Sequence, residues 1–97
     1  MTEYNVRVSI IIPHWNGIDI LSECLVSLFK TNHDSFEVIV VDNASTDGSQ
    51  SWLKNTYPQV KLIENKKNSG YAGGCNLGAL EAKGDYLVFL NNDTIQD

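Results

Sequence analysis

Residues 36–48 have the sequence FEVIVVDNASTDG, an apolar run that ends in a cluster of short acids, amides and hydroxyls. Residues 86–94, YLVFLNNDT, show the same pattern. Such runs are typical of buried parallel strands, and open α/β sheets bind ligands at the carboxyl ends of their strands. We therefore expect the polar residues after both runs to converge on one crevice, where their oxygens suit a base, a ribose and a divalent cation. These residues are Asp42, Asn43, Asn92 and Asp93.

Strand-like and helix-like patterns alternate along the whole chain. Strands are predicted at residues 8–13, 36–42, 60–64 and 85–90, and helices at 17–31, 47–57 and 70–83. A capping box formed by Asp47 and Gln50 is expected to begin the second helix, and Gly84 is expected to end the third. The alternation predicts one α/β domain over residues 1–97, a Rossmann-like parallel sheet of four strands in the order 3-2-1-4 with helices on both faces.

Composition narrows the class of protein. The chain has 97 residues, 42% of them hydrophobic, which is enough for a single packed core. Its formal charge of −5 argues against a nucleic-acid-binding face. We expect a cytoplasmic protein with reduced thiols, because residues 1–7 do not form a signal peptide and Cys24 and Cys75 form no CxxC motif. His14 and His33 have no ligand-spaced partner, so a metal site on either is not expected.

Two of the motifs, one polar and one rich in glycine, also have a purely structural interpretation. Asp42 and Asn43 are residue types that cap helices and form turns, and for an isolated cluster this interpretation would be preferred. The glycines of the third helix either let it pack closely on the sheet or let a ligand approach its first turns at Gly70, Gly73 and Gly74. Both can hold at once.

In combination, the motifs resemble the family 2 inverting glycosyltransferases of the GT-A fold. The resemblance rests on segments that stand in family order and spacing: residues 8–16, residues 40–49, Asn65, residues 68–78 and residues 84–94. The pair Asp42-Asn43, the loop NSGYAGG and the ending LNNDT look like the rhamnosyltransferase-like branch. The resemblance implies that the chain is the N-terminal, donor-binding half of a GT-A domain that acts on a nucleotide-sugar.

The resemblance also implies roles for individual residues. The donor-binding residues would be Pro13, His14, Trp15, Asn16, Asp42, Asn43, Gly70, Gly73, Gly74, Asn76, Asn91 and Asn92. Of these, residues 13–16 would border the base, and Asp42 and Asn43 would hold the base or ribose of a UDP- or dTDP-sugar. Asp93, in the family's DxD-like position, would bind a Mg²⁺ or Mn²⁺ ion that bridges the diphosphate.

The implied reaction is transfer of a hexosyl group, rhamnosyl included, to a saccharide or lipid-linked acceptor hydroxyl in cell-wall polysaccharide biosynthesis. In this family the general base is an acidic residue well downstream of Asp93, so we expect a truncated donor half without transfer activity of its own. The alternative is a non-catalytic nucleotide-binding or interaction domain. We expect the strand at residues 85–90 to be an open edge that pairs with a second copy as a homodimer, and the longer protein to be peripheral at the inner membrane face.

Overall fold

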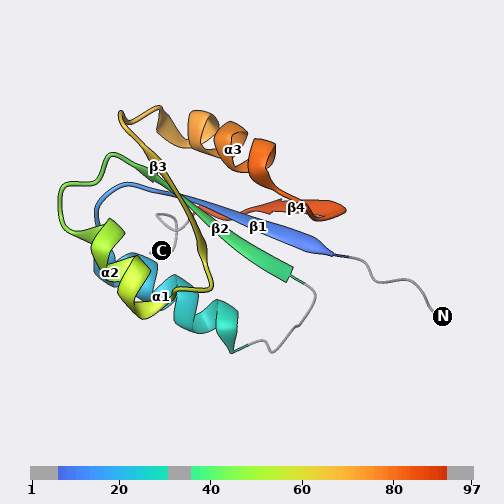
Figure 1. Ribbon diagram of the computed structural model, residues 1–97, viewed down its shortest axis with the longest axis horizontal. Coiled ribbons are helices and arrows are strands. Elements are labelled where there is room, and N and C mark those ends of the chain that lie inside the picture. Colours follow the sequence, from blue (N-terminus) through green and yellow to red (C-terminus); the bar gives the residue numbers. More distant parts are fainter. Residues whose placement is uncertain (1–6, 31–35, 92–97) are drawn as a thin grey trace.

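The computed structural model describes residues 7–30 and 36–91, and strands and helices alternate along this part of the chain (Figure 1). The elements are β1 (Val8–His14), α1 (Ile18–Phe29), β2 (Phe36–Asn43), α2 (Ser49–Thr56), β3 (Lys61–Asn65), α3 (Gly70–Glu81) and β4 (Tyr86–Phe89). All the predicted strands and helices are present, and their bounds differ from the expected ones by two residues or fewer. None of the helices in the described ranges is both long and apolar enough to cross a membrane.

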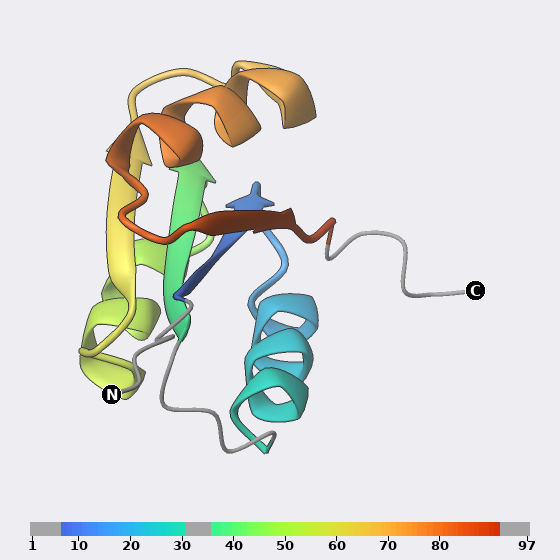
Figure 2. The same cartoon turned by 90° about the vertical axis from the view of Figure 1, so that its right-hand side faces the viewer.

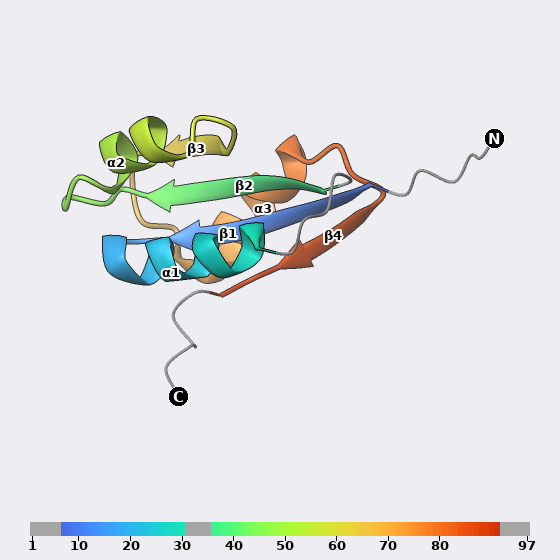
Figure 3. The same ribbon diagram turned by 90° about the horizontal axis from the view of Figure 1, so that it is seen from below.

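The strands form one parallel sheet in the order β3-β2-β1-β4, as predicted (Figure 3). β1 and β2 pair from Val8 opposite Phe36 to His14 opposite Asp42. β3 joins β2 at the same end, where Asn43 is opposite Asn65. The carboxyl ends of these three strands therefore share one edge of the sheet, and the loops that follow them meet there.

Helices cover both faces of the sheet, α1 and α2 on one face and α3 on the other (Figures 1 and 2). Alternation along the strands divides the apolar side chains between these faces. The core under α1 and α2 contains Ile10, Ile12, Leu21, Leu25, Val38, Val40, Leu53 and Val60, and the core under α3 contains Ile11, Ile39 and Val41. Full burial of one Leu or Ile side chain contributes about 1.5–3 kcal/mol, so these clusters hold the three layers together.

Aromatic rings close the core at the opposite end of the sheet from these loops. Phe29 stacks on Tyr57 with ring centroids 5.5 Å apart, and Phe36 at the start of β2 lies 6.1 Å from Phe29. Trp52 meets Tyr57 edge-on at 6.0 Å. The amino-terminal end of the sheet is thus packed with apolar rings, while the polar side chains gather at the carboxyl end.

The prediction that Gly84 ends α3 is wrong. α3 ends at Glu81, and the following Ala82 is extended, with φ −72° and ψ 141°. A Cβ on Gly84 would lie only 2.7 Å from the backbone nitrogen of Ser9, and the Gly84 amide donates to Ser9 Oγ at 2.8 Å. Gly84 is therefore needed for a close approach to β1 where the chain enters β4.

The predicted capping box of α2 is wrong in its second half. Asp47 Oδ1 accepts a hydrogen bond from the Ser49 amide at 3.0 Å, so Asp47 does satisfy a donor at the helix start. The left-handed Gly48, with φ 88°, is the residue that enters the helix, which makes Gln50 the second helical residue. A capping box needs its amide or acid at the third position. The Gln50 amide donates to Asp42 and Ser45 instead.

Candidate functional site

A cavity of about 180 Å³ lies where the carboxyl ends of β1 and β2 meet the loop that leads into α3. Its lining residues are Pro13, His14, Trp15, Asn43, Asn68, Gly70, Tyr71 and Asn91. Six of these residues are among those expected to bind the donor, whereas the side chains of Asn68 and Tyr71 were not assigned that role. Among the described residues, the wall carries aromatic, amide and imidazole groups and no carboxylate or ammonium group.

The β1–α1 loop forms one side of the cavity and is fastened to the β2–α2 loop. The Asn16 amide donates to Ser45 Oγ, and Asn16 Oδ1 accepts from the Thr46 amide, both at 2.8 Å. The Gly17 amide donates to Asp47 Oδ2 at 2.7 Å. Asn16 has a positive φ of 50°, a conformation that Asn tolerates better than most residues. Asn16 thus joins two loops and lies outside the cavity lining.

His14 is buried at the end of β1, and its Nε2 lies 2.9 Å from Ser49 Oγ. The Ser49 hydroxyl itself donates to Asp47, so the His14 Nε2–H is the donor toward Ser49. Burial alone would raise the pKa of Asp47, but hydrogen bonds from Ser49 and Gly17 outweigh it and lower that pKa. This chain of bonds fixes the His14 ring against the start of α2.

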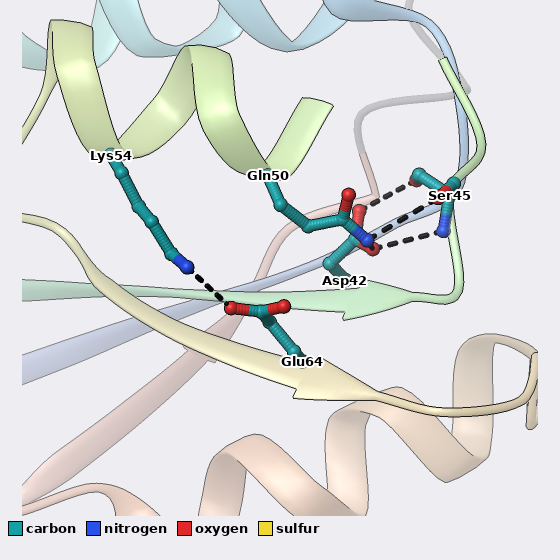
Figure 4. Close-up of polar contacts among 5 residues, drawn as sticks. All are labelled: Asp42, Ser45, Gln50, Lys54 and Glu64. Atoms are coloured by element: carbon teal, nitrogen blue, oxygen red, sulfur yellow. Dashed lines mark hydrogen bonds and ion pairs between the residues drawn. The ribbon is translucent and has the colours of Figure 1, made fainter. Parts of the chain in front are cut away.

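Asp42 is almost completely buried, and its carboxylate is occupied within the β2–α2 loop. It accepts hydrogen bonds from the Ser45 amide at 2.9 Å, from the Ser45 hydroxyl at 2.6 Å and from the Gln50 amide at 2.5 Å (Figure 4). Figure 4 also shows the exposed ion pair of Lys54 with Glu64 at 2.8 Å, a contact of small energetic weight. The geometry supports the turn-forming interpretation of Asp42. Its contact with a base or ribose stays a prediction.

Asn43 lies on the other side of β2 and faces the β3–α3 loop. Its Nδ2 donates to the Gly70 carbonyl at 3.2 Å, and its Oδ1 accepts from Asn65 at 3.0 Å and Ser69 at 3.3 Å. The Gly70 amide donates to Asn68 Oδ1 at 2.8 Å. Gly70 has a φ of 76°, which glycine adopts without strain. These bonds shape the loop that bounds the second side of the cavity.

The first turns of α3 pack directly on this loop and on β1. A Cβ at Gly73 would lie 2.5 Å from Ser69 Oγ, and one at Gly74 would lie 2.9 Å from the Pro13 side chain. Protein atoms therefore occupy the space beside both glycines, which supports close packing at these positions. Ligand approach remains a prediction at Gly70, Gly73 and Gly74; at Gly70 no heavy atom lies within 4 Å of such a Cβ.

Two exposed aromatic rings, Trp15 and Tyr71, stand at the cavity, with 53% and 44% of their surfaces accessible. Desolvation raises the pKa of Tyr71, and contact with the Cys75 thiol raises it further, so its phenol stays protonated at neutral pH. Flat rings and neutral hydrogen-bonding groups suit a planar heterocycle. Tyr71 and Asn68 lie within the glycine-rich motif 68–78, and an aromatic residue directly after a glycine of that motif was the sequence signal that could have identified Tyr71.

Of the remaining residues expected to bind the donor or the metal, only one lies at the cavity among those that the structure describes. Asn91 lines the cavity just after β4, whereas Asn76 is exposed on α3 and is not part of the lining. Asn92 and Asp93, including the predicted metal ligand, lie outside the described residues. Across residues 7–30 and 36–91 the structure contains no cluster of three or more His, Cys, Asp or Glu side chains that could hold a metal.

Comparison with known proteins places this geometry in a family. Residues 9–96 match the family described as glycosyl transferase family 2, and the chain belongs to that family. It is similar to a poly(ribitol-phosphate) beta-glucosyltransferase of Bacillus spizizenii, with 39% identity over 94 residues, 91% of this chain and 15% of the relative. It is also similar to a putative teichuronic acid biosynthesis glycosyltransferase of Bacillus subtilis, with 31% identity over 96% of this chain and 38% of the relative.

Solved structures show the same fold. A mannosyltransferase from Pyrobaculum calidifontis in complex with GDP-Man and Mn²⁺ superposes with a TM-score of 0.82 at 32% identity, covering 93% of this chain and 28% of that one. TarS of S. aureus, residues 1–349, in complex with UDP gives 0.81 at 29% identity, covering 91% of this chain and 28% of that one. The sheet order and the helix arrangement thus match the N-terminal part of GT-A structures. The chain spans between 15% and 38% of the length of the two curated relatives.

Proposed function

We propose that this chain is the donor-binding half of an inverting glycosyltransferase, and that the cavity holds the nucleoside of a nucleotide-sugar. The observation that carries the proposal is the position of the cavity: it lies at the carboxyl edge of a parallel sheet, the usual ligand side of open α/β folds, and Trp15 and Tyr71 are part of its lining. Membership of glycosyl transferase family 2 and the relatives solved with UDP and GDP-Man support this assignment.

The size of the cavity fits part of such a donor. Pockets for whole drug-sized ligands occupy about 300–1,000 Å³, and the cavity of about 180 Å³ is smaller. A base and part of a ribose fill it, with the base between the two aromatic rings. The diphosphate and the sugar extend beyond it, past Asn91.

A divalent cation fits this arrangement through one carboxylate. Asn91, whose side chain carries an amide oxygen, lines the cavity, and Asp93 follows two residues later in the sequence. Mg²⁺ and Mn²⁺ accept oxygen donors, and Mg²⁺ sites often use one or two carboxylates together with substrate phosphates. Asn91, Asn92 and Asp93 would hold the ion, which when bound neutralises charge on the departing nucleoside diphosphate. The mannosyltransferase relative contains Mn²⁺.

The finer assignments belong to the same proposal. The transferred group is a hexosyl residue, rhamnosyl included, and the acceptor is a saccharide or lipid-linked hydroxyl at the cytoplasmic face of the membrane. The relatives named for poly(ribitol-phosphate) and for teichuronic acid biosynthesis support a role in cell-wall polysaccharide synthesis. The general base is supplied from outside this chain, so the chain binds the donor without turning it over.

Titration calorimetry of the chain with UDP, dTDP and GDP, with and without Mn²⁺, tests the proposal. We expect saturable binding that Mn²⁺ strengthens, and we expect Asp93→Ala to abolish the metal effect while leaving metal-free binding unchanged. Binding that is equally strengthened by metal in Asp93→Ala would remove Asp93 from the cation site. Absence of saturable binding for all three nucleotides would refute donor binding altogether.

A further inference from the structure

We propose that Asn43 is a positioning residue whose amide holds the β3–α3 loop in the shape that closes one side of the cavity. The inference rests on the proposed function, because the cavity is the site assigned to the donor. Asn43 is only 3% exposed. Asn43 belongs to the cavity lining, but both polar atoms of its amide are bonded to protein groups of the β3–α3 segment, so the side chain holds the residues that form this side of the cavity.

Both ends of the Asn43 amide are used, with opposite polarity. Nδ2 donates to the Gly70 carbonyl at 3.2 Å, and Oδ1 accepts from Asn65 Nδ2 at 3.0 Å and from the Ser69 hydroxyl at 3.3 Å. An amide provides a donor and an acceptor on one planar group, whereas a carboxylate provides acceptors only. The contacts made by this side chain therefore require Asn and are not satisfied by an ionised Asp of the same shape.

The contacts extend beyond Asn43 into a closed arrangement. Asn65 Nδ2 also donates to Ser69 Oγ at 2.9 Å, so Asn43, Asn65 and Ser69 form a triangle of hydrogen bonds, here named the amide triangle. The amide triangle joins the end of β2 to the end of β3 and to the residue that precedes α3. Gly70 and Tyr71 follow immediately, and both line the cavity.

The start of α3 is shaped to accommodate the amide triangle. A Cβ at Gly73 would lie 2.5 Å from Ser69 Oγ, and a Cβ at Gly74 would lie 3.2 Å from Asn43 Nδ2. Side chains at these two positions would push α3 away from the loop. The two glycines thus leave room for the side chains that fix Gly70 and Tyr71, which is independent support for the positioning role.

The substitution Asn43→Asp tests the proposal with almost no change in volume. It keeps an acceptor for Asn65 and Ser69 but turns an oxygen toward the Gly70 carbonyl, leaving a buried repulsive contact. Asn55→Asp, at an exposed position on α2, makes the same chemical and charge change away from the site and serves as the control. At pH 7.5 we expect the affinity for UDP to fall at least about tenfold in Asn43→Asp and to stay within about twofold in Asn55→Asp, the scale of one lost buried hydrogen bond.

A pH series separates positioning from general damage to the fold. A protonated carboxyl has an O–H that can again donate to the Gly70 carbonyl. The ratio of the affinity of Asn43→Asp to that of the native chain, taken at equal pH, should therefore rise toward one between pH 7.5 and pH 5. His14 and Tyr71, the titratable groups that line the cavity, and Cys75 beside Tyr71 are present in both proteins and cancel in the ratio.

The outcomes distinguish this inference from the proposed function. Equal UDP affinities of Asn43→Asp and the native chain at pH 7.5 would overturn the positioning role. A native chain that binds no nucleotide would refute the proposed function, and the positioning role would then be judged on the ligand-free chain. In the ligand-free chain, hydrogen exchange of the backbone amides of Gly70 and Tyr71 should be faster in Asn43→Asp than in Asn55→Asp, and equal rates would overturn the inference.

Discussion

Replacing Gly78 by Ala should destabilise the fold, although Ala is the better helix former. Gly78 lies deep in α3, buried against β1, and a Cβ at this position would lie 2.3 Å from Ile11 Cγ2 and 3.3 Å from Ile11 Cβ and Cγ1. Ordinary contacts between carbon atoms lie near 3.5–4.0 Å. Ile11 has no exposed surface, so it has no solvent-filled space into which it can turn.

Two opposing terms set the size of the effect. Ala in place of Gly favours a helix interior by about 1 kcal/mol. Adding a methyl group to a well-packed core costs about 1–3 kcal/mol, and the 2.3 Å approach to a fully buried side chain puts Gly78→Ala at the upper end of that range. The overpacking term wins, and the net loss is about 2 kcal/mol. For a domain of this size that corresponds to a fall in Tm of roughly 8–16 °C.

Thermal unfolding followed by circular dichroism measures this shift. Asn76→Ala, at an exposed position on the same helix, is the matched control, because it changes helix propensity without touching the sheet. We expect the control to be unchanged or slightly more stable. A Gly78→Ala chain whose Tm equals or exceeds that of the native chain would refute the reasoning, since propensity would then dominate and the sheet would not limit the size of the side chain.

Three further predictions concern the acid sensitivity of the fold, the cavity and the buried loop contacts. Burial would raise the pKa of Glu37, but hydrogen bonds from Ser9 and the Lys83 amide, with the charges of Lys61 and Arg7, lower it below the ordinary 4.5. The ionised carboxylate therefore stabilises the fold above that pH, and this stabilisation is lost as the pH falls through the lowered pKa. Between pH 5.5 and pH 3, the free energy of unfolding in urea should fall less in Glu37→Gln than in the native chain, and an equal fall would exclude Glu37 as a source of acid sensitivity. Trp15→Ala should weaken UDP binding by about 5- to 150-fold without lowering Tm, because base stacking contributes about 1–3 kcal/mol and the ring is 53% exposed; unchanged affinity in calorimetry would remove Trp15 from the site. Ser45→Ala should lower the free energy of unfolding by about 1–3 kcal/mol, because Asp42 loses a buried donor and the Asn16 amide loses its acceptor; a chemical denaturation midpoint equal to that of the native chain would contradict this.

Most of the fold could be predicted because it depends on local patterns of burial. The apolar side chains of residues 36–41 can be buried only if helices pack on both faces of the sheet, and strands that alternate with helices are joined by parallel crossovers. The order β3-β2-β1-β4 follows from placing the longest apolar runs at the centre. Gly84 could not be predicted correctly, because its role is set by the closeness of Ser9, which lies 75 residues away in sequence.

The candidate site was predicted less completely than the fold, because the role of a polar side chain depends on the hydrogen-bond partners that the fold brings to it. The positions of Pro13, Trp15 and Gly70 at the cavity follow from topology alone, since loops after parallel strands meet at one edge. The bond from Gln50 to Asp42 depends instead on where the left-handed Gly48 starts α2. No spacing rule in the sequence distinguishes a Gln that caps its own helix from one that reaches a neighbouring strand.

The adjacency of Asp42 and Asn43 explains how one strand end organises both sides of the cavity. Successive residues of a strand point to opposite faces of the sheet, and Val40 and Val41 show this directly, the first in the core under α1 and α2 and the second in the core under α3. Asp42 continues the first face and bonds Ser45 and Gln50 of the β2–α2 segment, to which the β1–α1 loop is fastened. Asn43 continues the second face and holds the β3–α3 loop.

The chemical difference between these two residues matches what each face offers. On the face of Asp42, the partners are amide and hydroxyl donors, which suit a carboxylate. On the face of Asn43, a backbone carbonyl stands beside two donors, and only a group with both polarities satisfies all three. Exchanging the two residues would therefore leave a buried carboxylate against the Gly70 carbonyl and an amide among donors. An Asp42→Asn and Asn43→Asp double variant should accordingly be less stable than the native chain at equal composition, and a native-like denaturation midpoint would show that the two faces do not differ in this way.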